Sequence, residues 1–168
     1  GRHDLMPLDY LERIGRIRGV SAKYGRLWGY FYDPAVRATY TLLVPPQSSS
    51  AYREPAPGEI AIGAGIARTR GLEVGDYLSL RSSQGAPISL RIAAIFPHAT
   101  ERVSTDLMRL SEADFRRFFG YPEDRVTDIV LQVRNSLEVR TVAEKLSLAL
   151  PDSRPILREE ILRTYDAV

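Results

Sequence analysis

Three groups of residues have types and spacings that could do chemistry, and the first lies around His98. His98 and Glu101 are three residues apart, with Asp106 nearby. Two possible ligands without a third do not hold a metal ion firmly, and the chain has only two histidines and no cysteine. Ser104 adds the residue types of a hydrolytic triad, but no G-x-S-x-G elbow accompanies it. We therefore expect a solvated loop here, with no structural metal.

The second group is the glycine pair of Gly63-Ala64-Gly65, which lies between a predicted strand and a predicted helix. A dinucleotide fingerprint needs a third glycine at position 68, where the sequence has Arg68. The phosphate-binding pattern G-x-x-x-x-G-K-[ST] occurs nowhere in the chain. The pair thus indicates a tight turn, and we expect a domain that is not an enzyme and binds no cofactor.

The third group is an aromatic run that ends a predicted strand. Trp28, Tyr30 and Tyr32 share one strand face, because successive side chains alternate between faces. Such rings are either core residues or an interaction surface, since Tyr and Trp are enriched at interfaces. The nearby segment 45–58 is rich in proline, so we expect it to be exposed and poorly ordered beside these rings. The three aromatic residues are the candidate interaction surface.

Composition argues against a nucleic-acid-binding protein and against a membrane-spanning segment in this sequence. The chain has 168 residues, with 23 basic and 21 acidic side chains and a net charge of +2. Acidic residues are interspersed among the arginines, so no basic patch for nucleic acid is expected. The longest apolar run, Ile92 to Phe96, is far shorter than the roughly 20 residues of a membrane-crossing helix. No apolar stretch of a signal peptide follows Gly1.

Hydrophobic periodicity and turn residues predict the elements that must position these groups. The first part of the chain predicts a helix at 10–16, a long strand at 20–32 and a strand at 38–44 that pairs with it as a hairpin. The middle predicts strands at 59–62, 77–81 and 88–96 and a helix at 64–70. The last third predicts strands at 107–110, 127–134 and 154–157, and helices that begin at Ser111, Ser136 and Arg158.

A composition change in the Pro- and Ser-rich stretch after Val44 indicates a subdomain boundary. The predicted fold class is α+β. Residues 1–52 and 102–168 are expected to form one discontinuous, layered α/β subdomain. Residues 53–101 are expected to form a small β-rich subdomain inserted into it.

Several short motifs occur in an order and spacing that together resemble one family. They are Gly58–Gly63, Gly71–Leu80 with its Gly-Leu-Glu-Val-Gly-Asp turn, Leu90–Ile95, the opening helix and Gly-Val strand entry of 8–20, and the closing strand–helix pair of Thr127–Val133 and Leu137–Leu150. Over about residues 8 to 157 the chain resembles the extracytoplasmic core domain of MacB/FtsX-type ABC transporter permeases. In that family the α/β part is porter-like and the β-rich insert is sabre-like.

The resemblance implies a domain between two membrane helices, on the periplasmic side of the cell inner membrane. We then expect the chain to be a segment of a longer protein whose termini lie close together and face the bilayer. The implied partners are a cytoplasmic ABC ATPase, a second permease copy and a periplasmic adaptor. Membrane-helix movement would be coupled to substrate handling outside the membrane. The alternative is a periplasmic sensor or ligand-binding domain of a membrane receptor.

Overall fold

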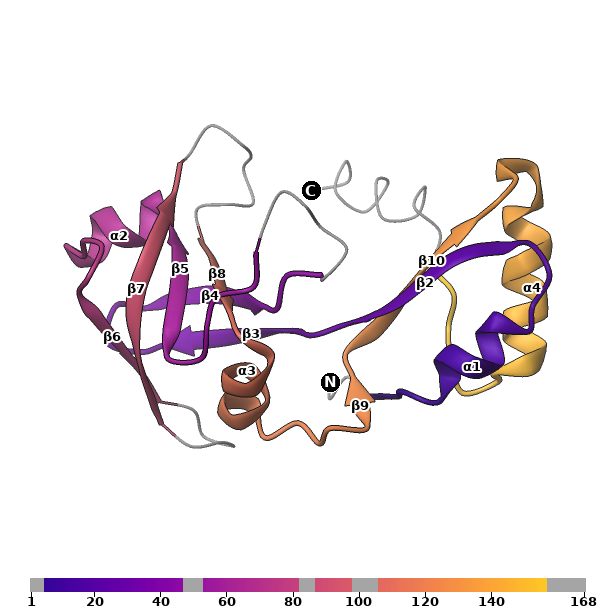
Figure 1. Cartoon of the computed structure of the whole chain (residues 1–168), viewed down its shortest axis with the longest axis horizontal. Coiled ribbons are helices and arrows are strands. Elements are labelled where there is room, and N and C mark those ends of the chain that lie inside the picture. Colours follow the sequence, from indigo (N-terminus) through magenta and orange to yellow (C-terminus); the bar gives the residue numbers. More distant parts are fainter. Residues whose placement is uncertain (1–4, 47–52, 82–86, 98–105, 157–168) are drawn as a thin grey trace. The chain divides into compact units, whose positions relative to one another are not determined.

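The computed structural model describes residues 5–46, 53–81, 87–97 and 106–156. The chain divides into two compact units, which we call unit 1 and unit 2. Unit 1 comprises Gly1–Pro7 and Gly25–Asp128, and unit 2 comprises Leu8–Tyr24 and Ile129–Val168. Figure 1 shows the elements of both units along the chain.

Unit 1 contains a six-stranded mixed sheet with the strand order β3-β4-β8-β5-β7-β6. Adjacent strands run antiparallel except for two parallel pairs, β4 with β8 and β5 with β7. A separate two-stranded pair joins β1 to β9. The strands are β1 (Met6–Pro7), β3 (Trp28–Asp33), β4 (Ala38–Leu43), β5 (Glu59–Gly63), β6 (Tyr77–Leu80), β7 (Ile88–Phe96), β8 (Leu107–Leu110) and β9 (Arg125–Val126).

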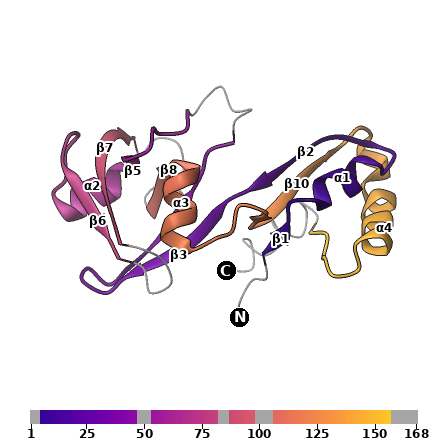
Figure 2. The ribbon, with the colours of Figure 1, turned by 60° about the horizontal axis from the view of Figure 1, so that its bottom comes forward.

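Two helices belong to this unit, α2 (Ala64–Arg70) and α3 (Glu112–Phe119). As expected, α3 follows directly on Ser111, whose Oγ accepts a hydrogen bond from the N–H of Asp114 at 3.2 Å. It ends at Gly120, which adopts the left-handed conformation that glycine tolerates best. Figure 2 shows α3 lying beside the strands of the sheet.

The helix α3 covers one face of the sheet near its β3 edge. The ring of Phe118 packs edge-on against Phe31 of β3, with centroids 5.3 Å apart. A Cβ atom added to Gly29 would lie 2.8 Å from the tip of the Phe119 ring. The core of unit 1 therefore lies on the face of β3 that carries Gly29 and Phe31. The fully buried side chains there and on the neighbouring strands include Leu42, Ile60, Ile62, Leu90, Ile92, Met108 and Leu110.

Unit 2 is built from α1 (Tyr10–Gly15), most of β2 (Val20–Arg26) and β10 (Asp128–Val133), and α4 (Val139–Ala149), which follows a short 3-10 helix, η3 (Ser136–Glu138). The strands β2 and β10 pair as a two-stranded sheet. Its buried residues are Ile14, Val142, Leu146 and Leu150. The helix predicted to begin at Ser136 is thus confirmed, with a 3-10 turn before α4. The side-chain cap of this turn is Asn135, whose oxygen accepts the N–H of Leu137.

The α+β fold class is confirmed, whereas the units are divided differently from the predicted subdomains 1–52 with 102–168 and 53–101. The hairpin β3–β4 and strand β8 share one sheet with β5, β6 and β7. The division in the structure falls instead after Pro7, Tyr24 and Asp128. The Pro-rich stretch is therefore a connection within unit 1, and its composition did not mark a boundary.

Two further differences concern single elements. The long strand predicted at 20–32 is interrupted at Leu27, which separates β2 from β3. The strand predicted at 154–157 is wrong for residues 154–156, which form no strand. The helix predicted to begin at Arg158 and the terminal residues lie outside the described residues, as do His98 and Glu101.

The close approach of Gly29 to Phe119 leads to a prediction. We expect Gly29→Ala to lower the free energy of unfolding by about 1–3 kcal/mol, because the new methyl group would overlap the ring. Chemical denaturation followed by circular dichroism measures the change. Shortening the ring in the double variant G29A/F119L should recover part of the loss. An unchanged midpoint for G29A alone would contradict the packing described here.

Candidate interaction surface at the aromatic strand

The three aromatic residues predicted to share a face do so on β3. The side chains of Tyr30 and Tyr32 are large and exposed, at 63% and 56% of their surface, and Trp28 is half-buried. The rings of Trp28 and Tyr30 meet edge-on with centroids 5.5 Å apart. The two tyrosines are therefore not core residues. That a partner docks on them stays a prediction.

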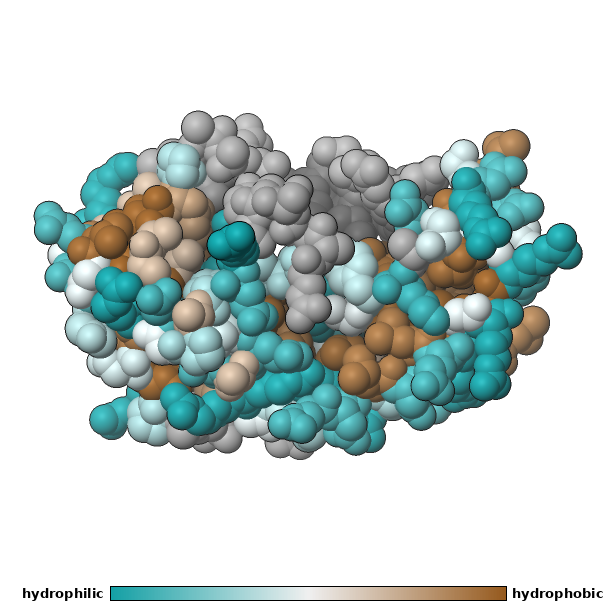
Figure 3. All heavy atoms as spheres, in the orientation of Figure 1, coloured by the Kyte–Doolittle hydropathy of each residue, from teal (hydrophilic) through white to brown (hydrophobic). Residues whose placement is uncertain are grey.

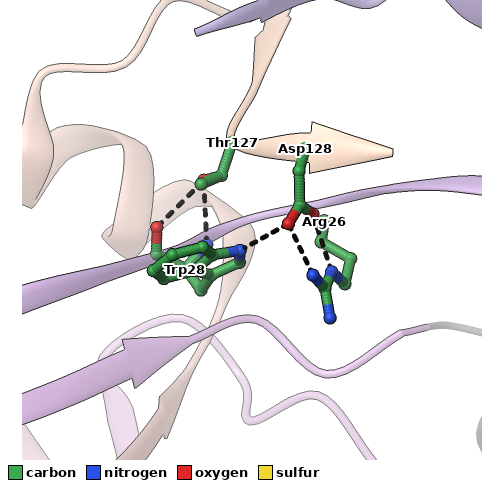
Figure 4. A network of polar contacts seen from close by, with 4 residues as sticks. All are labelled: Arg26, Trp28, Thr127 and Asp128. Carbon is green, nitrogen blue, oxygen red and sulfur yellow. Dashed lines mark hydrogen bonds and ion pairs between the residues drawn. The ribbon is translucent and has the colours of Figure 1, made fainter. Parts of the chain in front are cut away.

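A polar network fixes the Trp28 side chain (Figure 4). Its Nε1–H donates a hydrogen bond to Oδ2 of Asp128 at 3.1 Å. The same carboxylate accepts two hydrogen bonds from the Arg26 guanidinium, at 2.7 and 2.5 Å. Charge-assisted bidentate pairs of this kind add geometric specificity to a strong interaction. Asp128 is thus held in place by Arg26 and in turn orients the indole.

The side chain of Thr127 forms hydrogen bonds with both backbone polar groups of Trp28. The Thr127 hydroxyl accepts the Trp28 N–H at 3.0 Å and donates to the Trp28 carbonyl oxygen at 2.9 Å. A hydroxyl can fill both roles because it carries one donor and two acceptor sites. Neither Thr127 nor Asp128 was singled out from the sequence. They lie about a hundred residues from Trp28 along the chain, and no local pattern links such positions.

The register of the hairpin shows which way the remaining backbone groups of β3 point. The N–H of Val44 donates to the carbonyl of Leu27, and these two residues continue the antiparallel register of β3 and β4. Hydrogen-bonded pairs alternate along such a ladder. The backbone groups of Gly29, Phe31 and Asp33 therefore face β4, and those of Trp28, Tyr30 and Tyr32 face outward. This outer edge of β3 has no neighbouring strand within the described part of the chain.

The far end of β3 is held by an ion pair with α2. Nη1 of Arg70 lies 2.6 Å from Oδ2 of Asp33, and both side chains are largely buried. The other carboxylate oxygen of Asp33 accepts the N–H of Ala35 at 2.9 Å, which stabilises the turn of the hairpin. The aromatic strand is thus fixed at both ends, by Thr127 and Asp128 at one and by Arg70 at the other.

The described end of the Pro-rich segment makes hydrogen bonds to the rest of unit 1. At its end, the N–H of Gly58 donates to Oδ2 of the buried Asp114 at 2.8 Å, and the carbonyl of Gly58 accepts the N–H of Arg91 at 2.9 Å. Partial burial also raises the pKa of the Glu54 carboxyl. A hydrogen bond with the Glu112 backbone offsets part of that rise, and the charge of the Glu112 side chain adds to it. The expected exposure is confirmed at 53, 54 and 56–58, while poor order of the segment stays a prediction. Residues 47–52 lie outside the described residues.

Other surfaces of unit 1 offer less defined chemistry. Figure 3 shows apolar side chains gathering over α2 and β7 on one face, surrounded by hydrophilic ones. Among the described residues, no three His, Cys, Asp or Glu side chains come together as metal ligands would. Every buried polar side-chain atom of this part of the chain has a hydrogen-bond partner. The aromatic strand therefore remains the candidate site.

The network around Trp28 predicts a fluorescence change, because Trp28 is the only tryptophan of the chain. We expect Asp128→Ala to shift the emission and to make the indole more accessible to acrylamide, since its ring loses the hydrogen bond that orients it. The loss of stability should be about 0.5–1.5 kcal/mol. The matched control is Glu59→Ala, which removes a carboxylate paired with Arg91 elsewhere on the sheet. Equal spectra for D128A and the unchanged chain would contradict the network.

Comparisons with known proteins find similar structures but no similar sequence. No family model matches the chain, and no curated protein matches it. The fold resembles the crystal structure of "the extracellular domain of noncanonic ABC-type transporter YknZ from Gram-positive bacteria", with a TM-score of 0.53. The match covers 88% of this chain and 83% of that domain, at 12% sequence identity. The chain shares the fold of an ABC transporter extracellular domain.

A second similar structure is "a domain of a putative Permease protein from Porphyromonas gingivalis". It has a TM-score of 0.40 and 15% identity and covers 83% of this chain and 67% of that one. Only the first of these two matches is close enough in structure to show a shared fold. The resemblance found in the sequence is thus confirmed at the level of the fold.

Proposed function

We propose that this chain is the extracytoplasmic domain of an ABC transporter permease that couples movement of membrane helices to substrate handling or partner engagement outside the membrane. The observation that carries the proposal is the fold shared with the YknZ extracellular domain over most of both chains. ATP hydrolysis would take place in a separate cytoplasmic ATPase, so the domain itself would not be catalytic. We also propose that the permease is of the MacB/FtsX type and that it lies in the cell inner membrane.

The division of the chain into two units supports a mechanical role. The chain crosses between them after Pro7, Tyr24 and Asp128, so each unit is made of segments distant in sequence. Displacing a flanking membrane helix would then act on both units through continuous backbone. No described helix has the length and apolar character needed to cross a membrane. The membrane helices would belong to flanking parts of a longer protein.

A labelling experiment tests the location. The chain has no cysteine. The blank is therefore the full-length protein in which any cysteine outside this chain has been replaced by serine. Val74→Cys introduces a thiol at an exposed position of unit 1. In spheroplasts that express the full-length gene product, a membrane-impermeant maleimide should label V74C without permeabilisation. Labelling that requires permeabilised cells would overturn the proposal. The order of membrane helices encoded around this segment, next to an ATPase gene, provides an independent check.

Docking on the aromatic strand is the second part of the proposal. Tyr30→Ala should weaken transport or capture of a partner several-fold, since an exposed ring offers both apolar area and a polar group. The thermal midpoint should stay nearly unchanged. Tyr77→Ala is the matched control, because Tyr77 is equally exposed at 67% but lies on β6, at the opposite edge of the sheet. A large loss of stability for Y30A would show that the ring packs instead of docking.

A further inference from the structure

Within the described part of the chain, the outer edge of β3 lacks the features that usually keep sheet edges apart. Exposed edges are typically protected by charged side chains, prolines, bulges or a covering segment. Between Trp28 and Asp33 there is no lysine, arginine or proline. The only acidic side chain, Asp33, is directed to Arg70. The register of β3 with β4 continues without a bulge from Trp28 to Asp33.

The available edge is short and has defined ends. At one end the outward N–H and carbonyl of Trp28 are already paired with Thr127. At the other end the strand stops before Pro34, which has no N–H to donate. Between them, the outward groups belong to Tyr30 and Tyr32, and none of these groups has a hydrogen-bond partner in the described part of the chain. A strand that adds here must therefore fit five residues, Gly29–Asp33.

We propose that β3 pairs antiparallel with β3 of a second copy of this chain, so that two sheets of unit 1 become one. In the register we infer, Tyr30 lies opposite the partner's Tyr32, and each such pair exchanges both backbone hydrogen bonds. The two-fold axis passes beside Phe31, so the same patch serves both copies. Aromatic residues directly opposite each other across strands add side-chain contact to the backbone pairing.

A second copy fits this edge because, when two β3 edges run antiparallel, the outward N–H groups of each lie opposite the outward carbonyl groups of the other. The strand of the partner ends at its own Asp33, just before it would meet Thr127 of the first copy. A peptide running past that point would compete with Thr127 for Trp28. Pairing of such a short edge buries little area, so the isolated chains should associate weakly. Here the inference rests on the proposed function, because two permease copies tethered in one membrane would reach an effective concentration of about 1 mM.

Cysteine cross-linking tests the register, since the chain has no thiol of its own. Residues opposite each other in a hydrogen-bonded pair have Cα atoms about 5.5 Å apart, within the range of a disulfide. Chains carrying Tyr30→Cys are mixed with chains carrying Tyr32→Cys at about 1 mM, the concentration expected from a tether. When a mild oxidant is added to take up the two electrons and two protons of the thiols, the mixture should give a disulfide-linked dimer of one Y30C and one Y32C chain.

The single variants and a distant tyrosine supply the controls. Y30C alone and Y32C alone should cross-link at least five-fold less, because diagonal positions lie about 7–8 Å apart. Tyr77→Cys mixed with Y30C or with Y32C should give only the background of random collisions. Cross-linking of the Y30C and Y32C mixture at that background, or equal cross-linking of Y30C alone, would overturn the proposed pairing.

A backbone substitution separates strand pairing from simple contact between rings. Tyr30→Pro removes an N–H that points away from β4, so the hairpin keeps its own hydrogen bonds. Sedimentation of Y30P at about 1 mM should show monomer, whereas Y30A, which keeps this N–H, should retain part of the dimer. Circular dichroism confirms that both variants are folded. Equal association of folded Y30P and the unchanged chain would overturn the inference.

If Y30P does not fold, hydrogen exchange gives a second measure on the unchanged chain. The amides of Tyr30 and Tyr32 should exchange at least five-fold more slowly at about 1 mM than in dilute solution, while the amide of Tyr77 should not change. Concentration-independent exchange at both tyrosines would overturn the pairing. The impermeant-label experiment on V74C fails or succeeds independently of these results, so an error in the permease assignment is distinguished from an error in the interface.

Discussion

Phe118→Ala is expected to destabilise unit 1 by about 3–5 kcal/mol. Phe118 is fully buried, and its ring packs edge-on against Phe31 of β3 at 5.3 Å and against Phe119 at 5.0 Å between centroids. Truncation leaves a cavity between α3 and the sheet that neighbouring side chains cannot fill without leaving their own contacts. Urea denaturation followed by circular dichroism measures the loss.

The control for this prediction is an exposed ring on the same hairpin. Tyr32→Ala removes a side chain of similar size that is 56% exposed, so the change in stability should stay within about 0.5 kcal/mol. A loss for F118A no greater than that for Y32A would show that α3 does not pack on the hairpin as described.

Arg70→Ala is expected to lower the free energy of unfolding by about 2–4 kcal/mol. The side chains of Arg70 and Asp33 are only 19% and 11% exposed, so the variant leaves a carboxylate buried with the Ala35 N–H as its remaining partner. The surface pair of Arg91 with Glu59 is the matched control, because Arg91 is 42% exposed. Arg91→Ala should cost at most about 1 kcal/mol.

A double-mutant cycle checks that the effect belongs to the pair. Replacing Asp33 as well, in D33N/R70A, removes the unpaired buried charge. The double variant should therefore recover part of the stability that R70A loses. Strictly additive effects of D33N and R70A would contradict a direct interaction. An equal cost for R70A and R91A would show that the first pair is as solvated as the second.

Local elements could be predicted from the sequence because their signals lie within a few residues. The α3 helix is an example, since Ser111 caps its first turn and Gly120 supplies the left-handed residue that ends it. The alternation of 28–33 likewise placed three aromatic side chains on one face, as the structure confirms. The interruption at Leu27 could not be predicted, because the strand pattern of 20–32 is continuous across it.

The grouping of strands into units depends on pairing between distant segments, and the sequence carries no local signal for it. Strand β4 pairs with β8, which lies more than sixty residues later, and this pairing joins the hairpin to the strands assigned to the insert. The positions of Thr127 and Asp128 beside Trp28 arise in the same way. Composition marked the Pro-rich stretch as a boundary, although the chain returns to the same sheet after it.

The place of β8 in the sheet also constrains the order in which unit 1 can fold. β8 is the strand that hydrogen-bonds to β4 on one side and to β5 on the other. During synthesis the hairpin β3–β4 and the group β5–β7 can each form early, but neither can join the other until residue 110 has left the ribosome. Non-local closure of this kind slows folding. Until then each half exposes an open strand edge, so nascent chains that end before β8 should be the ones that need a chaperone.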